Sequence, residues 1–127
     1  LIDSTFDGSR SEDLRMAYVG GEIPVVFRKF KVLEKRFGTD YDHVDVWTAA
    51  DAFAPEEQGQ LIHFCEAMGL DFGAVDVMRD KHDGRIYVVD VNKTCMPVLC
   101  LSQKSQRAAL RRISESLIKL INRVKSN

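Results

Sequence analysis

The stretch Gly69–Pro97, GLDFGAVDVMRDKHDGRIYVVDVNKTCMP, decides the fold. It predicts two strands, Leu70–Asp80 and Arg85–Asn92, joined by a tight turn. Strands are rich in β-branched and aromatic residues and poor in Asp and Asn. Three oxygen-bearing side chains nevertheless stand among the apolar residues of these strands: Asp76, Asp90 and Asn92.

The pairing register of this hairpin offers a reason for the polar side chains. A three-residue loop that ends at Gly84, where a positive φ costs a glycine nothing, places Asp76 opposite Asp90 and Ala74 opposite Asn92. Because side chains alternate between the two faces of a strand, the two carboxylates and the amide then share one face. Opposed carboxylates repel at Cβ separations of roughly 5 Å, and a hard cation such as Mg²⁺ between them would reverse the sign.

Two alternatives remain open on this evidence. A two-residue turn at Asp83-Gly84 is also a good hairpin signal, and it would place Asp76 and Asp90 on opposite faces. The same residues are also compatible with two solvated carboxylates on the wet face of an antiparallel sheet.

Composition bounds the class of protein. The 127 residues amount to one domain over 1–127 or part of one, and the opening Leu1, with no Met before it, favours a fragment. A net charge of −1 argues against nucleic-acid and membrane partners, and no apolar run is long enough to span a bilayer. Cys65, Cys95 and Cys100 lack zinc-site spacing, which predicts free thiols and a cytoplasmic location.

The rest of the chain supplies a second hairpin and two helices. Asp13–Val19 and Glu22–Phe30 flank Gly20-Gly21, a strong two-residue turn signal. A helix is expected over Pro55–Met68, and a long amphipathic one from Leu101 to about Lys125. The buried stripe of the second helix is expected at Leu110, Ile113, Leu117, Leu120, Ile121 and Val124.

This order, β-β-α-β-β-α, predicts an α+β domain: two antiparallel hairpins form one sheet, and the helices pack on one of its faces. The segment Lys31–Ala54 shows little periodicity and is expected to be an irregular loop.

The first hairpin carries candidate phosphate ligands. With a Gly20-Gly21 turn, the register places Arg15 and Arg28 on one face, where two guanidinium groups could hold phosphate oxygens. The competing interpretation is a cross-strand pair between Arg28 and Asp13. Cys95 lies just beyond Asn92, but its only pKa-lowering neighbour would be a lysine, so a nucleophilic role is not favoured.

Taken together, these motifs resemble the C-terminal part of ATP-grasp ligases. The matching residues are Gly69-Leu70, Asp76, Asp83-Gly84, Tyr87, Asp90-Val91-Asn92 and Pro97. The upstream run Asp13-Leu14-Arg15, Val19-Gly20-Gly21, Pro24 and Arg28 is similar to the preceding segment in the glutathione-synthetase and ribosomal-protein-modifying branches. The resemblance covers about residues 1–100.

The resemblance implies a role for each candidate residue. Asp76, Asp90 and Asn92 would hold Mg²⁺ (or Mn²⁺) against the β- and γ-phosphates of ATP. Arg28, and Arg15 with it, would contact the transferred phosphoryl group or the acyl phosphate. The family forms an acyl phosphate from a carboxylate and ATP, and an amine or thiol then displaces the phosphate.

Two departures from the family pattern bear on the substrate. Asp90 stands where the family most often has Glu, one methylene longer, and Lys93–Pro97 replaces the usual small-Pro-Gly ending. The family's central nucleotide-binding lobe, which precedes these motifs, is also missing from the chain.

The sequence therefore predicts the C-terminal portion of a carboxylate–amine or carboxylate–thiol ligase that is inactive alone. Its expected partners are a small-molecule or peptide carboxylate, an amine or thiol acceptor, and the missing lobe. Homo-oligomer formation through the face that this lobe would cover is also expected. The alternative is a non-catalytic binding or regulatory module with the same fold.

Overall fold

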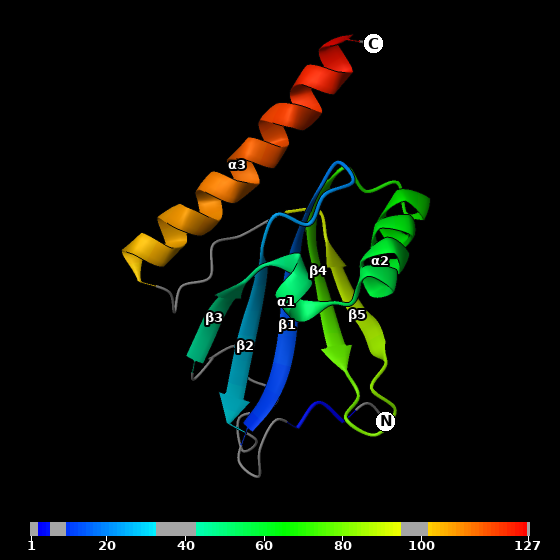
Figure 1. Ribbon diagram of the computed structural model, residues 1–127, viewed down its shortest axis with the longest axis vertical. Helices are drawn as coiled ribbons and strands as arrows, with labels where there is room; N and C mark the ends of the chain where they lie inside the picture. Colours follow the sequence, from blue (N-terminus) through cyan, green and yellow to red (C-terminus); the bar gives the residue numbers. More distant parts are fainter. Residues whose placement is uncertain (1–2, 6–9, 33–42, 95–101, 127) are drawn as a thin grey trace.

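A computed structural model describes residues 3–5, 10–32, 43–94 and 102–126 (Figure 1). Along the chain the elements are β1 (Arg10–Val19), β2 (Val26–Val32), β3 (His43–Trp47), α1 (Ala49–Ala52), α2 (Pro55–Ala67), β4 (Phe72–Arg79), β5 (Ile86–Asn92) and α3 (Gln103–Ser126). The strands form one antiparallel sheet in the order β3-β2-β1-β4-β5. The α+β class and both predicted hairpins are confirmed, and β1 and β4 join the hairpins at the centre of the sheet.

The fifth strand and a short helix correct the prediction of an irregular Lys31–Ala54 segment. β3 pairs with β2 from Val26↔Trp47 to Phe30↔His43, so its order comes from a neighbouring strand. After it, Thr48 begins α1 with a reciprocal capping box in which Asp51 N–H donates to Thr48 Oγ1 and Thr48 N–H donates to Asp51. A five-residue strand and a single helical turn carry too little periodicity to be found in the sequence alone.

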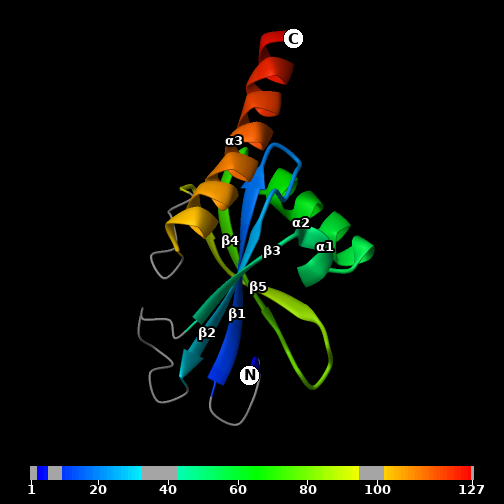
Figure 2. The same ribbon diagram turned by 60° about the vertical axis from the view of Figure 1, so that its left-hand side comes forward.

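The helices cover both faces of the sheet, which corrects the prediction that they pack on one (Figure 2). Alternate residues of β1 enter two separate cores. Leu14, Met16 and Tyr18 pack with residues of α1 and α2, among them Leu61 and Cys65. The side chains between them, Ala17 and Val19, pack instead with Ala109 and Ile113 of α3. The central strand is therefore apolar on both sides, and each side needs a helix to cover it.

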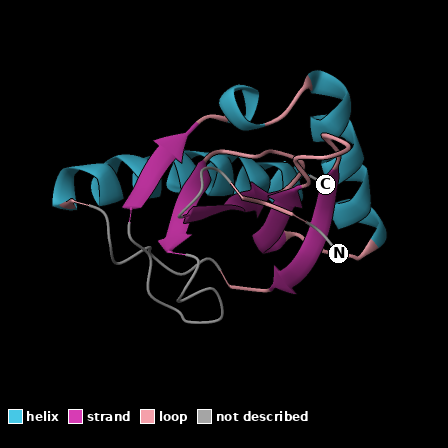
Figure 3. Cartoon of the chain, turned by 90° about the horizontal axis from the view of Figure 1, so that it is seen from below, coloured by secondary structure: helices cyan, strands magenta, loops and turns pink. Residues whose placement is uncertain are grey.

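Seen from below, α3 runs along one side of the strands (Figure 3). Its predicted apolar stripe is only partly buried. Ile113 is buried and Leu117 and Leu120 pack partly against the core, whereas Leu110 and Val124 are 45% and 66% exposed. None of the described helices is long and apolar enough to cross a membrane.

The β4–β5 hairpin has the predicted pairing of Asp76 with Asp90, although its loop differs from the predicted one. The loop has four residues, 81–84, because Asp80 N–H donates to Arg85 O, and Gly84 has the expected positive φ of 70°. One extra residue, Val89, then forms a bulge between the Val77↔Val88 and Asp76↔Asp90 pairs. The longer loop and the bulge offset each other, so Asp76 faces Asp90, and Ala74 faces Asn92.

The β1–β2 hairpin departs from the predicted register. Its turn is the expected one, with φ of 50° at Gly20 and 91° at Gly21. Beyond it, one additional residue is taken up in the irregular segment that contains Pro24, and regular pairing with β1 begins only at Val26. A proline has no N–H to donate to a ladder, so regular pairing is not expected at this point.

That one-residue shift corrects the prediction that Arg15 and Arg28 share a face. Arg28 lies opposite Leu14, and Arg15 lies opposite Phe27, so the two arginines are on opposite sides of the sheet. Lys29 takes the position, opposite Asp13, that the sequence had assigned to Arg28.

Candidate functional site

A row of charged residues crosses three adjacent strands. Arg15 of β1 is the register partner of Asp76 of β4, and Asp76 is the partner of Asp90 of β5. Phe27 of β2 continues the row on the other side of Arg15. Register partners in neighbouring strands project from the same face of a sheet, so the four side chains share one side. This side is the one that α3 partly covers.

Asp76 and Arg15 lie on adjacent strands without satisfying each other. Asp76 Oδ1 is buried and has no hydrogen-bond partner among the described residues, and the same holds for Arg15 Nε. Among the described residues no ion pair or hydrogen bond joins Asp76 to Arg15. A buried polar atom without a partner costs about 1–3 kcal/mol, so neither side chain is fully stabilised by the other.

Asp90 and Asn92 complete the predicted oxygen set at the exposed edge of the sheet. Asp90 Oδ1 accepts a hydrogen bond of 3.0 Å from Val91 N, and Asn92 Nδ2 donates to Asp90 Oδ2 at 3.4 Å. The amide group of Asn92 thus turns its nitrogen toward Asp90, which leaves its oxygen as an acceptor. Asp90 is exposed, whereas Asp76 and Asn92 are half-buried.

The backbones of β4 and β5 approach unusually closely beside these residues. A Cβ on Gly73 would lie 2.2 Å from the backbone oxygen of Asn92. Only glycine fits there, which gives a packing reason for a glycine inside a strand.

The arrangement fits a magnesium ion in its chemistry. Two carboxylates and an amide oxygen are hard oxygen donors, and one carboxylate oxygen, Asp76 Oδ1, is buried without a partner. Mg²⁺ is often held by one or two carboxylates, with phosphate oxygens and water as its remaining ligands. Within the described ranges, no three His, Cys, Asp or Glu side chains form a cluster that could hold a metal ion.

Lys29 is a residue that the sequence analysis missed. It lies on the same side of the sheet as Arg15, two residues after Phe27 in β2, and only 3% of its surface is exposed. Its cross-strand neighbour is Asp13. The sequence shows Lys29 as a charged residue in a strand, but the predicted register lacked the one-residue shift and therefore assigned this face to Arg28.

Arg28 belongs to the opposite side, where its surroundings account for it structurally. Its Nη2 donates to Glu12 Oε2 at 3.1 Å. Its guanidinium carbon lies 4.3 Å from the centre of the Trp47 ring and 4.6 Å from that of Phe30. Cation–π contacts and a cross-strand carboxylate hold the side chain against the sheet.

The cysteines do not add a nucleophile in the described part of the chain. Burial raises the pKa of the Cys65 thiol to about 11, so it is a protonated core side chain at neutral pH. Cys95, with most of the segment Lys93–Pro97, lies outside the described residues.

Comparisons with known proteins agree with this fold. No protein-family model matches the sequence, and no curated protein matches it. Among solved structures, it is similar to the ATP-grasp ligase PsnB complexed with a phosphomimetic variant of its minimal precursor, Mg and ADP: TM-score 0.53 and 14% identity over 80% of this chain and 33% of that chain.

Two further structures give the same result. PsnB complexed with precursor peptide PsnA2 and AMPPNP has a TM-score of 0.51 and 13% identity, over 81% of this chain and 32% of that chain. The macrocyclase MdnC bound with precursor peptide MdnA, from Microcystis aeruginosa MRC, has a TM-score of 0.56 and 17% identity, over 94% and 34%.

The chain therefore spans about a third of the length of these proteins. At such identities the likeness is one of fold. The five-stranded antiparallel sheet with its helices has the fold of the matching third of these ATP-grasp ligases, consistent with a C-terminal ATP-grasp subdomain.

Proposed function

We propose that this chain is the metal- and phosphate-binding portion of an ATP- and Mg²⁺-dependent ligase that joins a carboxylate to an amine or thiol through an acyl phosphate. The observation that carries the proposal is the row Arg15, Asp76 and Asp90, in which facing charges stay unpaired with each other. A row of opposed carboxylates is costly unless a cation joins it, and a neighbouring guanidinium is suited to phosphate oxygens.

Each residue of the row has a distinct part in this mechanism. Asp76 and Asp90, with the amide oxygen of Asn92, would hold Mg²⁺, which when bound neutralises charge on the phosphates. Arg15 would hold oxygens of the transferred phosphoryl group from the adjoining strand, and Lys29 adds positive charge on the same face. Positioning and charge neutralisation suffice for phosphoryl transfer, so no nucleophilic side chain is required.

The corrected register changes the assignment of the arginines. Arg28, which the resemblance pairs with Arg15 at the phosphates, lies on the other side of the sheet with Glu12 and Trp47. We therefore assign the phosphate contact of this chain to Arg15 and a structural role to Arg28.

A peptide carboxylate is the substrate class that we favour. PsnB and MdnC were solved with precursor peptides, and PsnB also with Mg and nucleotide. The chain matches about a third of each, so the remainder of the nucleotide and peptide sites belongs to other parts of an intact ligase.

The test uses the intact protein that contains this chain. Isothermal titration with the ATP analogue AMPPNP should give binding that requires Mg²⁺, and Asp90→Ala should abolish the Mg²⁺ dependence. Glu115→Gln removes one exposed negative charge from α3 and is the matched control, expected to bind as the parent does. Absence of Mg²⁺-dependent nucleotide binding in the parent would overturn the proposal and favour a non-catalytic module.

A further inference from the structure

The outward face of α3 is both apolar and basic. In the part of the chain that the structure describes, seven large hydrophobic side chains are exposed, and four of them belong to this one helix: Leu110, Ile118, Ile121 and Val124. Figures 1 and 2 show α3 to one side of the sheet, with its C-terminal half extending past the strands. A helix face in contact with water usually carries polar side chains, so this face has the composition of a contact surface.

The apolar residues follow the spacing of a helix–helix seam. A line of side chains along α3 has successive separations of four, three, four and three residues: Leu110, Ser114, Leu117, Ile121 and Val124. This line is called the seam, and its average spacing of 3.5 residues is that of the contact line in a coiled coil. On one flank Ile113 is buried and Leu120 packs partly against the core, whereas the other flank faces outward.

The outward flank of the seam is basic. Arg111, Ile118 and Lys125 each follow a seam residue by one position, and Arg107 lies one turn before the seam begins. Arg107, Arg111 and Lys125 form no hydrogen bond or ion pair with another described residue. A hollow of about 580 Å³ beside the first turns of α3 is lined by three cations, Lys104, Arg107 and Arg111.

The positive charge of the chain is concentrated on this helix. Seven basic residues and one acidic residue give α3 a formal charge of +6, whereas the whole chain carries −1. A basic helix with an exposed apolar stripe is typical of a surface that meets an acidic partner.

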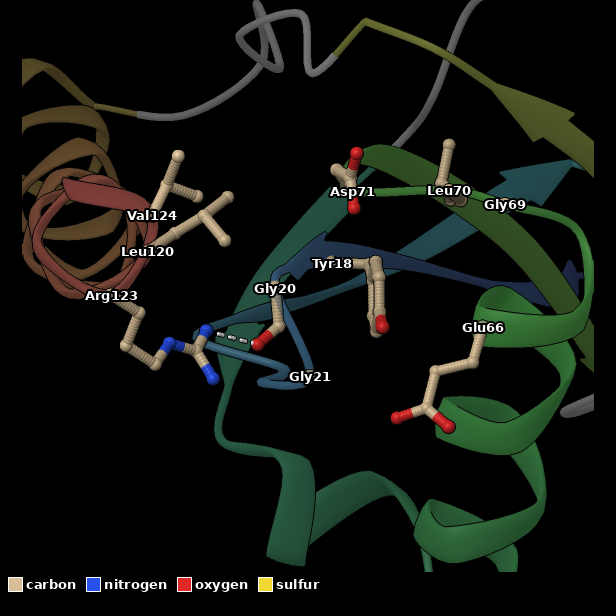
Figure 4. Close-up of a pocket in the computed structure, with 10 residues that line it drawn as sticks. All are labelled: Tyr18, Gly20, Gly21, Glu66, Gly69, Leu70, Asp71, Leu120, Arg123 and Val124. Carbon is tan, nitrogen blue, oxygen red and sulfur yellow. Dashed lines mark hydrogen bonds between the residues drawn. The ribbon is translucent and has the colours of Figure 1, made fainter. Parts of the chain in front are cut away.

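The basic residues on the sheet side of α3 are, in contrast, engaged by the fold. Lys119 Nζ lies 3.3 Å from Glu22 Oε1. Arg123 Nη2 donates to the backbone oxygen of Gly20 (Figure 4). A Cβ on Gly20 would lie 2.7 Å from atoms of Arg123 and Leu120, so the turn and the helix are in close contact. These contacts attach α3 by its inner side and leave the seam facing outward.

Charge argues against a second copy of α3 as the partner of the seam. Antiparallel pairing centred on Ile118 would place Arg111 of one copy opposite Lys125 of the other, because each lies seven residues from that centre. Like charges that face each other along a seam destabilise a helix pair, whereas carboxylates in the same places would be attracted.

We propose that the seam of α3 docks an amphipathic helix of another polypeptide, one whose apolar stripe is flanked by Asp or Glu. The apolar stripe would pack on Leu117 and Ile121, and the carboxylates would meet Arg107, Arg111 and Lys125. The contact from Arg107 to Lys125 spans about 27 Å, or roughly five helical turns.

Calorimetric titration of the intact protein with two synthetic helical peptides tests the proposal. Both peptides have three heptads with Leu at the a and d positions, and the e and g positions are Glu in one peptide and Lys in the other. Like charges on the flanks keep each peptide from pairing with itself. The Glu peptide should bind, about tenfold more weakly in high salt than in low salt because exposed charges are screened, and the Lys peptide should not bind.

Two neighbouring arginines provide matched variants. Arg111→Gln should weaken binding of the Glu peptide about threefold, as expected for loss of an exposed ion pair. Arg112 is exposed too, but it lies about 100° further around the helix, on the side away from the seam, so Arg112→Gln should leave binding unchanged. Ile121→Ser should weaken binding about tenfold through lost apolar contact. Arg111→Glu combined with Lys125→Glu should reverse the preference in favour of the Lys peptide.

Other occupants of the seam give different results, and each would overturn the proposal. Equal binding of both peptides, or of neither, removes the charge complementarity on which it rests. Cosedimentation with phosphatidylglycerol vesicles without peptide binding would make the seam a membrane contact. A dimer that Ile118→Ser dissociates would make it an interface between copies. Protection of Ile118→Cys from maleimide, followed by mass spectrometry, would show that another part of the same protein covers it. No nucleotide or Mg²⁺ enters these measurements, so their outcome is independent of the ligase proposal.

Discussion

Two arginine–carboxylate pairs, one on each side of β4, differ in whether the two side chains bond to each other. Arg79 donates to both carboxylate oxygens of Glu57 at 2.8 Å, and also to the backbone oxygens of Gly84 and Ala52. Arg15 and Asp76 are register partners in adjacent strands, yet each has a buried polar atom with no hydrogen-bond partner in the described part of the chain.

On the proposed function, the difference separates charges that stabilise the fold from charges that would bind a ligand. Arg79 connects α1 and α2 to the β4–β5 hairpin through hydrogen bonds from both of its terminal nitrogens. The Arg15–Asp76 row costs stability in the free protein, because buried unsatisfied groups and opposed carboxylates are both unfavourable. The comparison can be tested by changing one member at a time.

The largest expected effect follows Asp76→Asn. In the intact protein, ATP turnover should fall on the order of 100-fold, the cost of removing an electrostatic group from a site of charge development. The free energy of unfolding should stay the same or rise, because a repulsion with Asp90 disappears. Turnover and urea denaturation measure the two. A loss of stability with unchanged turnover would make Asp76 a structural residue.

Arg79→Met should instead lower the stability of the fold. Loss of the bidentate contact to Glu57 and of two backbone contacts should lower the free energy of unfolding by about 2 kcal/mol, at the modest end because the pair is partly solvated. Urea denaturation measures this value. Lys119→Met, which breaks the exposed pair with Glu22 at 3.3 Å, is the control and should cost less than about 0.5 kcal/mol. Equal losses in the two variants would contradict the assigned difference.

Substitutions of the two arginines of the first hairpin should also have different effects, one on stability and the other on nucleotide affinity. Arg28→Gln should lower the free energy of unfolding by about 1 kcal/mol through lost contacts with Trp47 and Glu12, and should leave nucleotide affinity unchanged. Arg15→Gln should leave stability nearly unchanged and weaken AMPPNP binding in the intact protein about tenfold. Denaturation and calorimetry on both variants decide the matter, and a drop in affinity with Arg28→Gln would restore it to the phosphate site.

The smallest effect is a pH dependence. The hydrogen bond from Arg79 lowers the pKa of Glu57 below its ordinary value of 4.5. The stabilisation is therefore complete above pH 4.5 and is lost as the pH falls through the lower pKa of the folded state, where Glu57 takes up a proton. Between neutral pH and that range the parent should lose about 1 kcal/mol more than Glu57→Gln. Denaturation curves from pH 7 to 3 provide the measurement, and parallel curves would refute the assignment.

Residue chemistry and local spacing were sufficient for the α+β class, both hairpins and helix α2. Pro55 begins that helix as expected, and Gly69, with φ of 70°, follows its end. The opposition of Asp76 and Asp90 was also predicted, although through a loop one residue too short. The bulge at Val89 compensates, because it lets Val88 and Val91 both face the α2 core.

Only the tertiary structure decided which side of the sheet each basic residue occupies. One extra residue around Pro24 moves Arg28 away from Arg15 and brings Lys29 to its side, since a shift of one residue turns every side chain of a strand to the other face. In the same way β3 and the covering of both faces depend on neighbours distant in the chain. The sequence by itself determined both hairpins, the two longer helices and the oxygen-bearing residues of β4 and β5. Long-range pairing determined which charged side chains meet, because register depends on irregularities that local patterns do not record.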